Sequence, residues 1–172
     1  MPKPILNIAD VELQPRPAAF AASGEAAGKY DARMGEIAPR VGARLLGYNI
    51  TAVPPGMRAF PKHNHRANEE MFFVLEGSGE LHFGDQIHAV RTGDVIGCPP
   101  GGPETAHQLV NTGATELKYL AVSTRLSPEV CEYPDSGKFG VSVYSSDDAD
   151  GQPWAFRHIG RKGDARDYWE GE

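Results

Sequence analysis

The 172-residue sequence has little of several features that define large protein classes. Its two cysteines, Cys98 and Cys131, are too few for a disulfide framework and agree with a reducing compartment. No apolar run approaches the length that crosses a bilayer, and the first residues lack the continuous apolar stretch of a secretory signal. We therefore expect a cytoplasmic protein with no membrane partner.

Basic charge is also scarce. The chain has 17 Lys and Arg against 23 Asp and Glu, which gives a formal net charge of −6. An acidic balance of this kind argues against nucleic acid or an anionic membrane as partner. The glycines around Ser78 do not form a dinucleotide-binding fingerprint either. A small molecule is therefore the expected partner.

Turn-forming residues are abundant, with 20 Gly and 14 Pro. They separate short runs rich in β-branched and aromatic residues, which is typical of an all-β chain. Gly84-Asp85 stands between two such runs and predicts a two-residue hairpin turn. We predict strands at residues 43–53, 71–76, 79–83, 86–90, 94–98, 107–111, 115–124 and 140–144.

These strands predict one domain over residues 1–172, because no internal repeat is present. The barrel core is expected at about 43–124. An extended arm at 1–40, with one short helical turn near 25–30, precedes it. A polar, turn-rich C-terminal extension at 125–172 follows it.

Three of the six histidines fall into a pattern with one glutamate. His63 and His65 are two apart, so they share a face if the segment is extended. Glu70 stands at the start of the apolar run that follows, and His107 begins a later extended run. Three imidazoles and a carboxylate suit a single divalent transition-metal ion. The pattern therefore predicts a metal site inside a barrel.

Each of these residues also has a plainer interpretation. A lone histidine in a strand is usually a surface residue or a satisfied core residue, and Glu69-Glu70 alone would be a solvated charge pair. The joint pattern with its glycines and prolines favours the metal site. Cys98 lies near His107 and could line a cavity, but a buried cysteine more often packs as a small hydrophobe.

Two stretches resemble the signature motifs of the cupin superfamily. The first motif, G-x5-H-x-H-x3-4-E-x6-G, matches at His63, His65, Glu70 and Gly77, with one extra residue after Gly56. The second, G-x5-P-x-G-x2-H-x3-N, matches at five positions but has five residues in place of two before its histidine. Those positions are Gly93, Pro99, Gly101, His107 and Asn111.

The resemblance implies a small antiparallel barrel, a double-stranded β-helix of jelly-roll type. It also implies that His63, His65, Glu70 and His107 hold the metal inside one end. The longer pattern is similar to a group of bacterial single-domain cupins, some of which carry provisional sugar-phosphate isomerase labels. The fold hosts many reactions, so the resemblance is specific for the fold and not for the reaction.

The alternation along residues 70–76 predicts an oligomer. If Glu70 points inward, Phe72 and Val74 do too, and Met71, Phe73 and Leu75 face outward. An exposed apolar row of that size needs a cover, which could be another sheet, the arm or a second subunit. We favour a homodimer.

An open metal site of this composition predicts an enzyme that acts on a small oxygen-rich molecule. Fe(II) or Mn(II), the favoured ions, would suit dioxygenase chemistry; Zn(II) or Ni(II) is possible and would suit isomerase or lyase chemistry. A structural zinc is the less favoured reading, and a non-catalytic binding or sensing cupin is the alternative function. No catalytic base is identified. Candidates for the substrate pocket are Arg44, Tyr48, Arg58, Phe72 and Tyr119.

Overall fold

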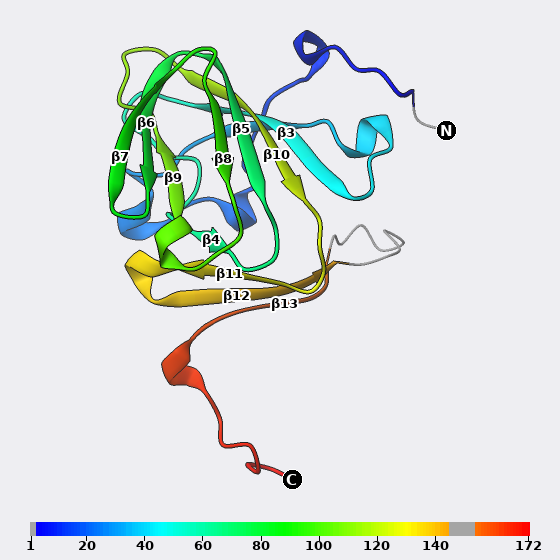
Figure 1. The fold of residues 1–172 in the computed structure, drawn as a ribbon, viewed down its shortest axis with the longest axis vertical. Coiled ribbons are helices and arrows are strands. Elements are labelled where there is room, and N and C mark those ends of the chain that lie inside the picture. Colours follow the sequence, from blue (N-terminus) through cyan, green and yellow to red (C-terminus); the bar gives the residue numbers. More distant parts are fainter. Residues whose placement is uncertain (1–2, 145–153) are drawn as a thin grey trace.

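The structure, a computed structural model, describes residues 3–144 and 154–172. The strands form a jelly-roll barrel, and a further sheet lies across one of its ends (Figure 1). All strand pairs are antiparallel, and the helices of the described part are short 3₁₀ turns. Within these residues, no helix is long and apolar enough to cross a membrane.

Two sheets make the barrel and one closes its end. The six-stranded sheet runs β1 (Gln14–Pro15), β2 (Arg33–Glu36), β3 (Leu46–Val53), β10 (Leu117–Thr124), β5 (Glu70–Glu76) and β8 (Val95–Cys98). The three-stranded sheet runs β7 (Gln86–Arg91), β6 (Ser78–Phe83) and β9 (His107–Val110). The end sheet runs β13 (Trp154–Arg161), β12 (Lys138–Tyr144), β11 (Glu129–Tyr133) and β4 (Asn64–His65). The 3₁₀ turns are Ile8–Asp10, Ala18–Phe20, Gly24–Ala26, Pro39–Val41, Pro103–Thr105, Pro134–Ser136 and Lys162–Asp164.

The barrel core lies between the six-stranded and the three-stranded sheet. Phe72 and Val74 of β5 point into it and are buried, as the alternation from Glu70 predicts. Tyr119 of β10 packs against Phe72, with the two ring centroids 5.5 Å apart. The remaining members are Cys98, aliphatic side chains from both sheets, and Ala32 and Ala59 from the connections, so the core is held by apolar burial from either side.

The outer face of the six-stranded sheet is partly covered by the N-terminal arm. Leu75 and Leu120 on that face pack against a second apolar cluster, which includes Val11 and Ile37 of the arm. Met71 and Phe73 on the same face are half-buried. The arm therefore supplies one of the covers expected from the sequence, and the homodimer stays a prediction.

The predicted strands of the barrel are confirmed, with ends that shift by a few residues. Gly84-Asp85 forms the expected hairpin turn, because Phe83 pairs with Gln86. The prediction for residues 1–40 was too simple: β2 joins the sheet beside β3, and β1 pairs with β2. The sequence pattern did not indicate β11 and β13, whereas the extended backbone expected at residues 63–65 is confirmed by β4. β11 pairs with the distant β4, which local periodicity cannot reveal, and β13 pairs with β12.

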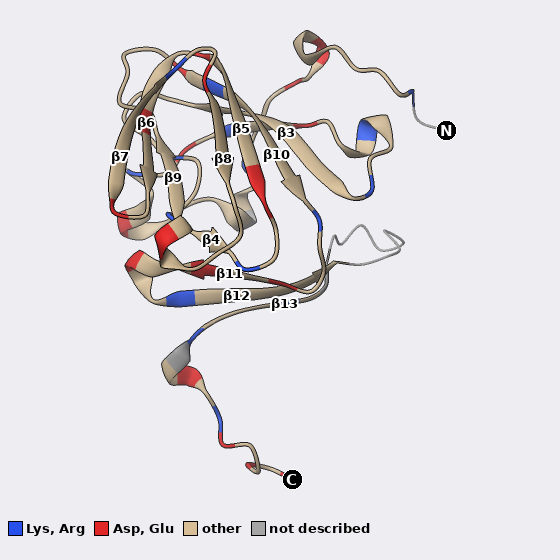
Figure 2. Cartoon of the chain, viewed as in Figure 1, with Lys and Arg blue, Asp and Glu red and all other residues tan. Residues whose placement is uncertain are grey.

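Charged side chains of both signs are distributed over the strands and their connections (Figure 2). Ion pairs such as Arg33–Glu116 and Lys118–Glu76 join residues of opposite sign. That nucleic acid is not a partner stays a prediction from the acidic net charge.

Gly79 of β6 provides a test of the packing between the three-stranded sheet and its neighbours. A Cβ added there would lie 2.3 Å from the Val110 carbonyl oxygen and 3.1 Å from Leu117 Cδ2. Gly79→Ala should therefore lower the free energy of unfolding by about 1–3 kcal/mol in urea denaturation. Gly97→Ala on β8, where a Cβ meets nothing within 4 Å, is the matched control. Equal loss in the two variants would contradict this packing.

Candidate metal centre

The four predicted ligands come from different sheets and meet at one end of the barrel. His65 lies on β4 of the end sheet, where it pairs with Cys131. Glu70 is the first residue of β5 and His107 the first of β9. His63 is tied to His107 by two backbone hydrogen bonds, of 3.1 and 2.8 Å. The extended backbone at 63–65 therefore places both imidazoles on one face, as their spacing predicts.

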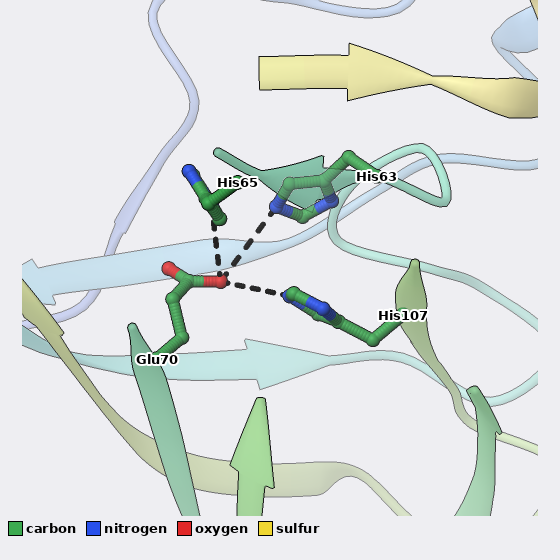
Figure 3. A group of neighbouring side chains, drawn as sticks. All are labelled: His63, His65, Glu70 and His107. Atoms are coloured by element: carbon green, nitrogen blue, oxygen red, sulfur yellow. Dashed lines mark hydrogen bonds and ion pairs between the residues drawn. The ribbon is translucent and has the colours of Figure 1, made fainter. Parts of the chain in front are cut away.

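The three imidazoles converge on one carboxylate oxygen (Figure 3). Glu70 Oε2 lies 2.9 Å from His107 Nε2, 3.5 Å from His65 Nε2 and 3.7 Å from His63 Nε2. All four side chains are largely buried. One ligand atom from each residue lies within 4.8 Å of the ligand atoms of the other three. Ligand atoms about 2.1 Å from a shared ion are themselves about 3.0–3.4 Å apart, so the cluster is close to the size a divalent metal needs.

The second nitrogen of each ring supports the same conclusion. His63 Nδ1 lies 2.8 Å from the Pro61 carbonyl and His107 Nδ1 lies 3.1 Å from the Thr105 carbonyl. A carbonyl can only accept, so both Nδ1 atoms carry a proton, and in the neutral ring each Nε2 then presents a lone pair to a metal. Lone pairs that face a carboxylate at these distances repel unless a cation lies among them. The donor set therefore fits a metal ion.

Electrostatics show how strongly the cluster demands a positive charge. Burial lowers the pKa of His65, but the carboxylates of Glu129 and Glu70 outweigh burial and raise it to about 9. Burial raises the pKa of Glu70, yet His107, His63 and His65 together hold it well below its usual range. The His65 contacts, at 3.5 and 3.8 Å, are too long for hydrogen bonds, so the attraction is electrostatic. A proton on His65 supplies the positive charge that a bound metal ion would otherwise supply.

A cavity of about 310 Å³ opens beside the cluster. His63, His65 and Glu70 form its floor, and Phe60 and Phe72 line one side. The C-terminal extension forms much of the rest, through β11, β12 and β13. The side chains of this part that bear on the chemistry are Glu129, Cys131, Tyr133, Tyr144, Arg157 and Ile159.

The cavity differs from the substrate pocket expected from the sequence. Phe72 is the one predicted pocket residue on its wall; Arg44, Tyr48, Arg58 and Tyr119 are not among its lining residues. Tyr119 is buried in the core behind Phe72. The sequence prediction placed the pocket among barrel residues. Local pattern does not reveal that the C-terminal extension folds over the end of the barrel.

The two cysteines lie in different surroundings, and the expectation for Cys98 is confirmed. Cys98 is buried in the barrel core and packs as a small hydrophobe. Cys131, on β11 opposite His65, lines the cavity. Burial raises the pKa of Cys131 to about 12, so its thiol stays protonated at neutral pH.

The fold and the site together define a jelly-roll barrel that could hold one metal ion through three imidazoles and a carboxylate. Residues 49–123 match the family model described as cupin domain, and this range contains all four candidate ligands. Residues 49–123 therefore form a cupin domain, as the two motifs predict. Strands β11, β12 and β13, which close the cavity, lie outside the matched range.

Curated relatives match the barrel and leave the rest of the chain unmatched. An oxalate-binding protein of Thermotoga maritima is 33% identical over 70 residues, and an uncharacterised protein of Methanocaldococcus jannaschii is 35% identical over 71. Each match covers 41% of this chain and 54% of the relative. The chain therefore spans about half the length of these relatives.

Solved structures match the fold over almost the whole chain. A sugar phosphate isomerase of the cupin superfamily from Silicibacter pomeroyi is 21% identical with a TM-score of 0.75, covering 97% of this chain and 98% of that one. A protein with the same name, given provisionally, from Acidithiobacillus ferrooxidans is 23% identical with a TM-score of 0.75, covering 95% and 96%. A polyketide cyclase from Streptomyces resistomycificus, 22% identical over 73% of this chain and 82% of its own, gives 0.55. At these identities the likeness shows the fold and leaves the reaction open.

Removal of one imidazole should abolish tight metal binding and leave the barrel folded. We expect His63→Ala or His107→Ala to lower metal occupancy sharply, because each takes away one of three neutral donors. Metal analysis of the purified variants measures the occupancy, and circular dichroism reports the fold. His82→Ala, on β6 and outside the cluster, is the matched control. Full occupancy in both site variants would show that the assigned ligands are wrong.

Proposed function

We propose that the chain is a metal-dependent enzyme that acts on a small, oxygen-rich, anionic organic molecule. The observation that carries this proposal is the convergence of three Nε2 atoms on Glu70 Oε2 at the floor of an open cavity. A purely structural zinc would have a closed ligand shell, whereas here His63, His65 and Glu70 face the space in which a ligand could lie.

His63, His65, Glu70 and His107 would hold the metal. Three neutral imidazoles and one carboxylate leave a divalent ion with a net charge of about +1 and favour first-row ions, among which we propose Fe(II) or Mn(II). Such an ion supplies Lewis acidity for a chelated carboxylate or hydroxy-ketone and, as Fe(II) or Mn(II), dioxygen chemistry.

The cavity walls supply hydrogen-bond donors and one positive charge. Burial, with a further contribution from Cys131, raises the pKa of Tyr133, and burial raises the pKa of Tyr144. Both hydroxyls therefore stay protonated and can donate to an oxygen-rich ligand. Apart from the histidines, Arg157 is the basic residue among the described residues that line the cavity. Its guanidinium suits a carboxylate or phosphate group.

The lining residues favour some reaction types over others. Isomerisation through an enediolate needs a protein base near the substrate. Apart from Glu70, Glu129 is the carboxylate among the described residues that line the cavity. Burial raises the pKa of Glu129, but His65 and the backbone N–H groups of Ala67 and Asn68 outweigh burial and lower it. A carboxylate held in this way is a weak base. The proposal therefore favours dioxygenase or lyase chemistry over isomerisation.

A second candidate is metal-dependent binding of a small ligand without turnover. The weak base at the cavity wall favours it, and one curated relative is named an oxalate-binding protein. Both candidates need the same metal site, and they differ in whether a bound ligand is converted.

Elemental analysis and a turnover assay test the two candidates together. We expect tag-free protein, purified without chelator, to contain about one Fe, Mn, Ni or Zn per chain. The Fe(II)-loaded and Mn(II)-loaded protein should then consume oxygen or release product from a panel of carboxylates, hydroxy-ketones and sugar phosphates, and His107→Ala should not. Metal binding and ligand binding without conversion would support the second candidate. Protein that contains no metal and takes none up would contradict both.

The proposed anionic substrate predicts a role for Arg157. Loss of one charge-assisted hydrogen bond at this position should weaken binding of oxalate, used as the probe, by about tenfold or more. Titration calorimetry on metal-loaded Arg157→Gln measures the effect, with metal content checked separately. Arg161→Gln is the matched control, because Arg161 lies on the same strand and does not line this cavity. Equal affinity in the two variants would exclude Arg157 as an anion-binding residue.

A further inference from the structure

The two ligands His65 and Glu70 are joined by a loop of four residues that passes from one sheet to another. His65 ends β4 in the end sheet, and Glu70 begins β5 in the six-stranded sheet. Strand pairing fixes each ligand within its own sheet. The placement of one ligand relative to the other therefore depends on residues 66–69.

The side chain of Glu129 binds this loop from β11. Its Oε1 accepts hydrogen bonds from the backbone N–H groups of Arg66, at 3.0 Å, and Ala67, at 3.4 Å. Its Oε2 accepts from the backbone N–H of Asn68, at 2.8 Å, and from the Asn68 side-chain amide. Glu129 is 2% exposed, so these bonds form in a poorly solvated place where each is strong.

The Asn68 side chain extends the same attachment to the far end of the loop. Its Oδ1 accepts from the Leu126 backbone N–H at 2.6 Å and from the Thr124 hydroxyl at 2.9 Å. The Thr124 hydroxyl oxygen in turn accepts from the Glu69 N–H at 3.0 Å. The loop is thus hydrogen-bonded at each residue to the segment 124–129, and the carboxylate of Glu129 is the one charged group in this network.

The same carboxylate faces the imidazole of His65. Glu129 Oε1 lies 3.8 Å from His65 Nδ1, on the opposite side of the ring from Glu70. His63 and His107 each have a backbone carbonyl in the corresponding place. His65 Nδ1 is buried and makes no hydrogen bond within the described residues, and the Glu129 carboxylate at 3.8 Å is an acceptor that faces it.

We propose that Glu129 is a positioning residue for the metal centre. Glu129 holds loop 66–69 and orients His65 so that Nε2 is the ligand atom. Both oxygens of Glu129 already accept two donors each, so it acts through His65 and does not serve as the base. This inference rests on the metal site of the proposed function.

A double-mutant cycle in Co(II) affinity tests the proposal, since the d–d spectrum of Co(II) reports binding directly. We expect Glu129→Gln to weaken Co(II) binding by about tenfold or more relative to the wild type. In a His65→Ala background the same change should have a clearly smaller effect, because the ring through which Glu129 acts is gone. An equal effect in both backgrounds, or no effect in either, would overturn the proposal.

Two controls separate this outcome from others. Glu80→Gln removes the same charge from a glutamate that faces His82, 3.2 Å away and outside the site, and should change Co(II) affinity by about twofold or less. A loss in Glu80→Gln as large as that in Glu129→Gln would overturn the proposal. Failure of the wild type itself to bind Co(II) would instead contradict the proposed function.

A measurement on the wild type keeps the proposal testable if Glu129→Gln does not fold. In Zn(II)-loaded protein, long-range ¹H–¹⁵N spectra of the histidine rings distinguish the protonated nitrogen from the metal-bound one. We expect His65 to carry its proton on Nδ1 and to bind zinc through Nε2. Zinc bound through His65 Nδ1, the atom that faces Glu129, would overturn the proposal.

Discussion

The buried carboxylate of Glu70, surrounded by three imidazoles, is the interaction on which the rest of the structure depends. An uncompensated charge at such a place would be costly, so the site requires a cation. The ligands reach it from the six-stranded sheet through Glu70, the three-stranded sheet through His107 and the end sheet through His65. The candidate metal site is therefore also the point at which the three sheets meet, and its geometry follows from their packing.

The barrel and the C-terminal extension have separate tasks in this arrangement. The barrel, with its cupin domain at residues 49–123, provides the candidate ligands. The extension covers the open end and gives the cavity its polar wall, including Tyr133 and Arg157. This wall lies on β11, β12 and β13, outside the range that matches the cupin domain. In the proposed function it selects the ligand, and the lowered pKa of Glu129 favours chemistry that needs no separate protein base.

The sequence predicted the barrel strands and the clustering of the four candidate ligands, because both follow from short-range pattern and motif. His63 and His65 share a face through the two-residue repeat of a strand, and the alternation after Glu70 correctly placed Phe72 and Val74 in the core. Glu129 was missed because it lies 59 residues beyond Glu70 and reaches the site only through the pairing of β11 with β4. Arg44, Tyr48 and Arg58 were chosen as candidate polar groups of the pocket, and they are not among its lining residues, because local pattern does not report the chain segment that closes it.

X-ray absorption spectroscopy of the metal-loaded protein tests the central claim most directly, because it counts the donors around the ion. The structure predicts three imidazole ligands, visible through their multiple scattering, together with oxygen donors that include one carboxylate. The same measurement on His107→Ala should show two imidazoles. A spectrum of the wild type that is fitted with fewer than three imidazoles, or that requires sulfur ligands, would contradict the account.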